Sequence, residues 1–151
     1  MGNFKDKLLG SCDFYDNCSQ VVYAVFRAFV GFGLAYGHGL GKVPPSDGFV
    51  GLVGGIGLPA PEIFAWMAAL GELAGGILIF LGLFTRPAAM IAGVTMLVAW
   101  YTHAFGPLSA DKGDFTGQEK ALLYLVSLAI ITAVGAGKFG IDSFFSKKAK
   151  S

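Results

Sequence analysis

The sequence predicts an all-α integral membrane protein, a four-helix bundle with its N and C termini in the cytoplasm. Three observations lead to this fold class. The chain of 151 residues is only 14% charged, whereas soluble domains carry about 25% charged residues. Four apolar runs are each long enough to cross a bilayer, which takes roughly 20 residues. The chain also contains 23 glycines, which membrane helices tolerate because glycine lets two helices approach closely.

The predicted spans follow from the apolar runs. The first run carries Arg27 and no A-x-A cleavage site follows it, which disfavours a signal peptide. The connection at residues 41–59 contains the apolar string GFVGLVGGIGLP. This string is too short to cross, so we interpret it as a re-entrant or interfacial segment. The four spans are residues 19–40, 60–84, 87–106 and 119–137.

The basic residues predict the orientation of the bundle, because lysine and arginine concentrate in cytoplasmic loops. With four spans, the side that holds both termini carries Lys5, Lys7, Arg86, Lys138, Lys147, Lys148 and Lys150. The opposite side carries only Lys42, Lys112 and Lys120. We therefore expect both termini to lie in the cytoplasm.

The flanks of the bundle are short. We expect a cytoplasmic interfacial segment at residues 1–18, the four-helix domain at 19–142 and a basic cytoplasmic tail at 143–151. Cys12 and Cys18 are expected on the reducing side of the membrane, which disfavours a structural disulfide and leaves a redox pair as an alternative. An apolar stripe indicates a helix on the membrane surface. Its members are Phe4, Leu8, Cys12 and Tyr15.

Glu72 lies near the middle of the second apolar run. An acidic side chain at that depth costs about 2.5–3.5 kcal/mol on insertion scales, so the protein must offset the cost. Arg27 in the first span differs from Glu72 in depth by ~6 Å, at a rise of 1.5 Å per residue. We therefore predict an ion pair between Arg27 and Glu72. Such a pair either only holds two helices in register or marks a ligand or proton site.

A second polar group is predicted at the outer end of the bundle. His38 and Lys42 end the first span, His103 ends the third and Glu119 begins the fourth. We expect these side chains to share one pocket, with Lys42 at its mouth, for a polar ligand headgroup or a partner. A polar interfacial rim is the alternative. No spacing within one helix resembles H-E-x-x-H, so we predict no metal site.

Several motifs resemble the DoxX family. They are GFGLAYGHGLGK at 31–42, GELAGGILIFLGLFTRPAA at 71–89, the downstream AFG and GQEKALLY, and GAGKFGID at 135–142. The string from Glu72 to Arg86 is the most specific of them. The resemblance covers about residues 19–142 and implies a four-helix, multi-pass protein of the bacterial cytoplasmic (inner) membrane. The family positions that carry over are Lys42, Glu72, Gly75, Gly76, Arg86, His103, Glu119 and Asp142.

For function, the resemblance implies a membrane subunit associated with a redox or respiratory complex. We add the hypothesis that the bundle holds a quinone-like apolar ligand near Glu72, because proton-coupled quinone chemistry needs an ionisable side chain in a dry site. No flavin motif, haem ligand pair or outer cysteine pair is found in the sequence. No catalytic residue is therefore assigned, and whether the chain is an enzyme stays open.

Two other functions are compatible with the sequence. One is a non-enzymatic membrane scaffold or assembly subunit, whose glycine-rich faces dock other helices. The other is a small-molecule or proton transporter, which the lack of an inverted repeat disfavours. The expected partners are the lipid bilayer and other membrane subunits or further copies of the chain. A net charge of +1 gives no argument for nucleic acid.

Overall fold

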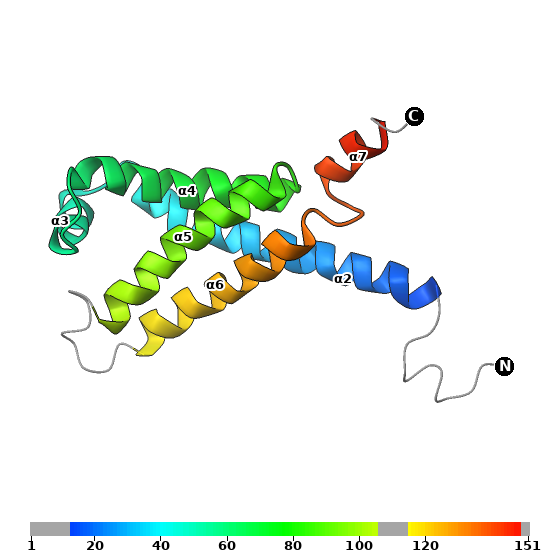
Figure 1. The fold of residues 1–151 in the computed structure, drawn as a ribbon, viewed down its shortest axis with the longest axis horizontal. Coiled ribbons are helices and arrows are strands. Elements are labelled where there is room, and N and C mark those ends of the chain that lie inside the picture. Colours follow the sequence, from blue (N-terminus) through cyan, green and yellow to red (C-terminus); the bar gives the residue numbers. More distant parts are fainter. Residues whose placement is uncertain (1–12, 106–114, 149–151) are drawn as a thin grey trace.

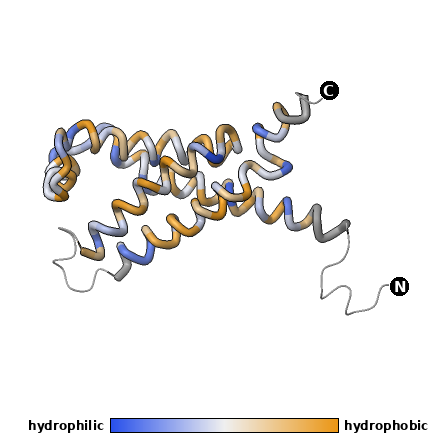
Figure 2. Tube along the Cα trace, viewed as in Figure 1, coloured by the Kyte–Doolittle hydropathy of each residue, from blue (hydrophilic) through white to orange (hydrophobic). Residues whose placement is uncertain are grey.

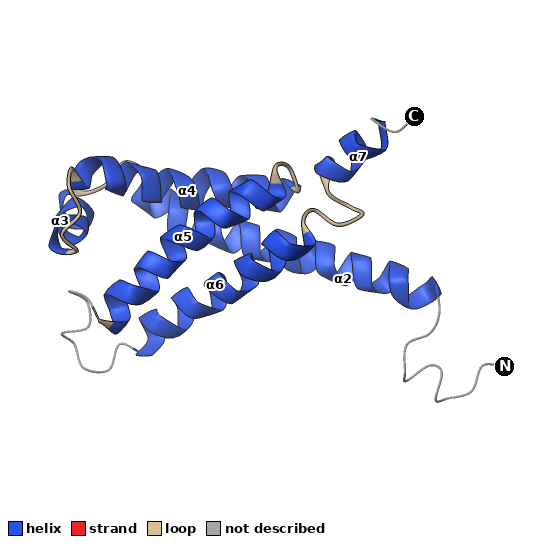
Figure 3. Cartoon of the chain, in the orientation of Figure 1, coloured by secondary structure: helices blue, strands red, loops and turns tan. Residues whose placement is uncertain are grey.

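The computed structural model describes residues 13–105 and 115–148. Every regular element in this part of the chain is helical (Figure 3), which confirms the all-α class. Phe4, Leu8 and Cys12 of the predicted surface helix lie outside the described residues. The elements are α2 (Asp13–Phe32), η1 (Gly33–Gly39), η2 (Leu40–Lys42), α3 (Asp47–Gly55), α4 (Pro61–Leu81), α5 (Thr85–Ala104), α6 (Phe115–Val134) and α7 (Ile141–Lys148).

Within residues 13–105 and 115–148, three helical stretches are long and apolar enough to cross a membrane. They are Cys18–Lys42, Pro61–Leu81 and Gly117–Val134, and they match the first, second and fourth predicted spans. Helix α5 matches the third predicted span in place and packs against both α4 and α6. It is not among the three apolar stretches, since residues such as Thr95, Thr102 and His103 lower its mean hydropathy. Its crossing of the membrane stays a prediction.

The helices form an elongated arrangement (Figure 1). Helices α4 and α5 are joined by a tight turn, and α6 runs beside α5. The start of α2 and helix α7 lie toward one end, whereas α3 lies at the other end beside the start of α4. Apolar residues extend along the lengths of the helices (Figure 2). Large apolar side chains such as Val22 and Phe29 are exposed, as expected where the surrounding solvent is lipid.

The first two spans contact each other through glycines, backbone against backbone. A methyl group added to Gly31 would lie 2.5 Å from the amide nitrogen of Phe80, and one added to Gly76 would lie 2.8 Å from the carbonyl oxygen of Gly31. Farther along, a methyl group on Gly39 would lie 2.5 Å from Cα of Leu73. These contacts leave no room for a side chain. They fix an antiparallel register in which Gly31 faces Phe80 and Gly39 faces Leu73.

Small and aliphatic side chains fill the core behind this contact. The alanines of α5 keep it close to α4, because a methyl group on Gly75 would lie 3.6 Å from Cβ of Ala92, an ordinary van der Waals distance. The core residues are Val30, Leu34, Ile79, Ala88, Ala89, Ala92, Met96, Leu128 and Ile131. Helix packing in lipid depends on such close contact, since lipid tails are as apolar as the side chains.

Asp142 ties the end of the chain to the turn between α4 and α5. Its carboxylate accepts the backbone N–H of Phe84 at 2.8 Å and of Thr85 at 2.9 Å. Its own N–H donates to the carbonyl of Gly82 at 2.9 Å. Gly140 packs against the same turn, because a methyl group on Gly82 would lie 2.7 Å from its Cα. Asp142 thus caps α5, and the two motifs at 71–89 and 135–142 meet in space.

Asp142→Ala is expected to lower the stability of the folded protein by about 1–2 kcal/mol, the range for loss of an N-terminal helix cap. Asp142→Asn keeps one carbonyl oxygen that can accept an N–H, so it should cost less. Thermal unfolding of the three proteins in the same detergent measures the difference. Equal midpoints for Asp142→Ala and the parent protein would contradict the capping role.

Candidate functional site

Glu72 is buried inside the described part of the chain, with 1% of its surface exposed, as predicted. Both of its carboxylate oxygens accept hydrogen bonds from Nζ of Lys42, each at 2.7 Å. Lys42 ends the η2 turn, and its side chain is 28% exposed. Its ammonium also lies 5.3 Å from the centre of the Phe49 ring on α3, a cation–π distance. The pair therefore joins a buried carboxylate to a partly exposed cation.

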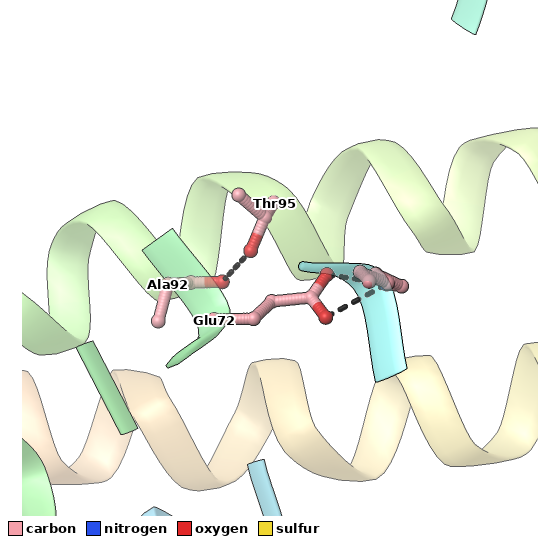
Figure 4. A network of polar contacts seen from close by, with 4 residues as sticks. Glu72, Ala92 and Thr95 are labelled. Atoms are coloured by element: carbon pink, nitrogen blue, oxygen red, sulfur yellow. Dashed lines mark hydrogen bonds and ion pairs between the residues drawn. The ribbon is translucent and has the colours of Figure 1, made fainter. Parts of the chain in front are cut away.

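Helix α5 closes the site on another side. Thr95 and Ala92 lie beside Glu72 in Figure 4, where the hydroxyl of Thr95 donates to the carbonyl of Ala92 at 2.7 Å. Gly71, next to Glu72 in the chain, brings α4 close to α5, since a methyl group there would lie 3.4 Å from Cγ2 of Thr95. The Thr95 hydroxyl is engaged with its own helix. Among the described residues, the charged partner of Glu72 is Lys42.

The predicted ion pair between Arg27 and Glu72 is wrong. Arg27 is buried, with 3% exposed, but its Nη1 donates to the carbonyl of Ile79 and, at 2.9 Å, to that of Phe80. Ile79 lies about two turns from Glu72, or ~10 Å along the helix. The glycine contacts set this register, because Gly31 faces Phe80. Arg27 therefore reaches the last turn of α4, where carbonyls lack helical partners and favour a cation.

The structure brings two members of the predicted outer cluster near Glu72. Lys42 binds it directly, and His38 precedes Gly39, which packs against Leu73, the residue after Glu72. The His38 ring meets the edge of the Tyr124 ring on α6, with 5.1 Å between the centres. No signal in the sequence marked Tyr124. From the sequence, Lys42 is expected only at the mouth of an outer pocket. Counting residues along a helix does not show how far its side chain reaches back toward Glu72.

The other two members lie where α5 and α6 approach each other. The carbonyl of His103 accepts a hydrogen bond from Nε2 of Gln118 at 3.2 Å. Glu119, the next residue, is exposed. This contact joins the end of α5 to the start of α6. A single pocket shared by His38 and His103 stays a prediction.

The first span changes its helical geometry where it carries His38. Residues Gly33–Gly39 form a π-helix of 7 residues. Each π turn spans one residue more than an α turn, and such segments occur frequently at functional sites. The spacing of about 100° per residue that a continuous α-helix would give no longer holds beyond Gly33. Hydrophobic periodicity contains no sign of this change.

The side chains gathered at this site carry groups that can exchange protons. In the described residues, no group of three or more His, Cys, Asp or Glu side chains could hold a metal ion. The carboxylate of Glu72 is already held by an ammonium group. The lysine is Lys42, and an imidazole and a phenol meet each other at His38 and Tyr124. All of these groups can donate or accept protons.

Comparisons with known proteins agree with the motifs. The family described as DoxX matches residues 22–104, which include Lys42 and Glu72. A Haemophilus influenzae protein, named "Uncharacterized protein", is 34% identical over 127 residues, covering 82% of this chain and 92% of its own. "Putative oxidoreductase CatD" of Bacillus subtilis is 31% identical over 115 residues, covering 76% of this chain and 80% of its own. No solved structure matches the chain.

Proposed function

The chain belongs to the DoxX family, and we propose that it is a membrane subunit of a redox or respiratory complex. In this proposal the Lys42–Glu72 pair exchanges protons beside a quinone-like apolar ligand. The observation that carries the proposal is the combination of a carboxylate with 1% exposure and a lysine partner with 28% exposure. The name of the Bacillus subtilis relative, an oxidoreductase, supports the same class of function.

The pair suits proton transfer for a physical reason. Reducing a quinone to a quinol takes up electrons and an equal number of protons. The electrons would come from a partner redox subunit, and Glu72 would pass the protons. Burial disfavours a charged carboxylate and a nearby cation favours it. Lys42, which is 28% exposed, would connect the buried Glu72 with water while protons pass through the pair.

The orientation and location belong to the same proposal. The start of α2 and helix α7 lie toward the same end of the molecule (Figure 1), which supports an even number of crossings. If α5 also crosses the membrane, the chain has four spans. Lys42 then lies on the outer side and both termini lie in the cytoplasm. The membrane is then the bacterial cytoplasmic membrane. Partner subunits or further copies of the chain would cover part of its exposed apolar surface.

Quinone content tests the proposal. The protein is purified from membranes, and the quinone in its lipid extract is measured per mole of protein. We expect Glu72→Gln to lower bound quinone roughly tenfold or more, since a hydrogen bond to a charged group contributes about 1.5–3 kcal/mol. Glu62→Gln is the matched control, because Glu62 begins the same helix and is exposed. Size-exclusion profiles check that each variant stays folded.

Two outcomes would contradict the proposal. Equal quinone in the parent protein and in both variants would mean that Glu72 does not contact the ligand. Extracts without quinone, from protein that co-purifies with other membrane subunits, would favour the non-enzymatic scaffold instead. The close glycine contacts between the spans are compatible with either role.

A further inference from the structure

Several aromatic side chains are exposed around helix α7. Phe139 is 59% exposed, Phe144 72% and Phe145 60%. Together with Lys138 and Ile141 they line an open hollow of about 430 Å³. Helix α7 stands clear of the other helices in Figure 1. Among the described residues, these phenylalanines therefore present an apolar surface outside the bundle.

The backbone under this surface is anchored. The hydroxyl of Ser143 donates to the carbonyls of Lys138 at 2.8 Å and Gly140 at 2.7 Å. The N–H of Lys138 donates to the side-chain oxygen of Gln20 at 3.2 Å. Asp142 binds the start of α5, as described above. These bonds hold the segment in one place relative to α2 and α5, so its apolar side chains have a fixed position.

The surface continues onto the first span. Phe139 also lines a second open hollow of about 380 Å³, on the outside of α2. Its other lining residues are Val21, Ala24, Val25, Arg27 and Ala28. The two hollows share Phe139, so an apolar track leads from α7 along a helix long and apolar enough to span the membrane. The dimensions and chemistry of such a track suit an acyl chain.

The charge at the end of the track is positive. Lys138 follows closely after Val134, where the last apolar stretch ends. Lys147 and Lys148 end α7. The carboxylate of Asp142 is engaged by two backbone N–H groups. Basic residues next to the membrane attract anionic lipid by about 1 kcal/mol each, and aromatic side chains beside them are typical of interfacial segments.

From this surface we infer a binding site for an anionic phospholipid of the surrounding bilayer. Lys138, which lines the hollow, supplies charge for the headgroup, and the sequence adds two lysines where α7 ends. The acyl chain lies over Phe139 and along the outer face of α2. The inference does not depend on the Lys42–Glu72 pair, because the track does not include either residue.

A fluorescent reporter tests the site in the full chain. The sequence has only 2 tryptophans, so Trp66→Phe with Trp100→Phe gives a background for a single reporter, Phe144→Trp. The protein is reconstituted into phosphatidylcholine vesicles that contain equal fractions of brominated phosphatidylglycerol or brominated phosphatidylcholine. We expect the anionic brominated lipid to be enriched roughly fivefold around the reporter, the effect of about one lysine at the surface.

Controls separate this site from the bulk bilayer. Leu123→Trp in the same background places a reporter on an exposed position of α6, a helix that lines neither hollow, and we expect no preference there. Lys138→Gln with Lys147→Gln and Lys148→Gln should abolish the preference at position 144. Phe145→Trp provides a second reporter if the first variant folds poorly. Equal quenching by both lipids, or quenching by neither, would overturn the inference; the second result would mean that protein or water covers α7.

Discussion

Gly76→Ala should destabilise the bundle by about 3 kcal/mol or more, at the upper end of the cost of overpacking. The added methyl group would lie 2.6 Å from the amide nitrogen of Ala35 and 2.8 Å from the carbonyl oxygen of Gly31. Both neighbours are backbone atoms of the facing span, so no side chain can move aside. The two helices must separate, and they lose the close contact on which helix association in lipid depends.

Gly37→Ala is the matched control, because Gly37 lies in the first span and an added methyl group there meets nothing within 4 Å. Its stability should stay within about 0.5 kcal/mol of the parent protein, as for other exposed substitutions. Gly31→Ala should behave like Gly76→Ala, since it obstructs the same contact. The measurement is the fraction of folded protein after stepwise heating in detergent, read by size-exclusion chromatography. Similar losses for Gly37→Ala and Gly76→Ala would mean that the register of the two spans is wrong.

The sequence was sufficient for three of the four predicted spans and for the burial of Glu72. Apolar length alone predicted three stretches that the structure bears out, because bilayer thickness sets that length. A carboxylate in the middle of such a run must face protein rather than lipid. The outer-end residues His38 and Lys42 were also named from the sequence. Their proximity to Glu72 could not be predicted from the sequence, because it depends on how the two helices are shifted along each other.

That shift is decided by atomic contacts that periodicity does not record. The positions of Gly31 and Gly39 against the second span set the depth at which each charge finds a partner. The π-helical segment then changes the faces of the residues that follow Gly33. A difference of one or two helical turns was enough to exchange Arg27 for Lys42 as the partner of Glu72. For Asp142, the family resemblance marked the residue, and only the fold revealed that it caps α5.

Lys42→Met should be more destabilising than Glu72→Gln, although the two variants break the same ion pair. Without Lys42, a carboxylate with 1% exposure loses its charged partner. Stranding a buried charge in this way typically costs ~3–5 kcal/mol. Without the charge on Glu72, the side chain of Lys42, which is 28% exposed, can turn toward water. Glu72→Gln should therefore cost only about 1.5–3 kcal/mol, the contribution of a hydrogen bond to a charged group.

The double variant Lys42→Met with Glu72→Gln separates this explanation from a general sensitivity of the site. It removes both charges, so its stability should return close to that of Glu72→Gln and exceed that of Lys42→Met alone. Arg27→Met with Glu72→Gln should show no such recovery, because Arg27 binds the carbonyls of Ile79 and Phe80 instead. Denaturant or thermal unfolding of six proteins gives the two coupling energies: the parent, the single variants Lys42→Met, Glu72→Gln and Arg27→Met, and the two double variants. Recovery with Arg27→Met, and none with Lys42→Met, would restore Arg27 as the partner of Glu72.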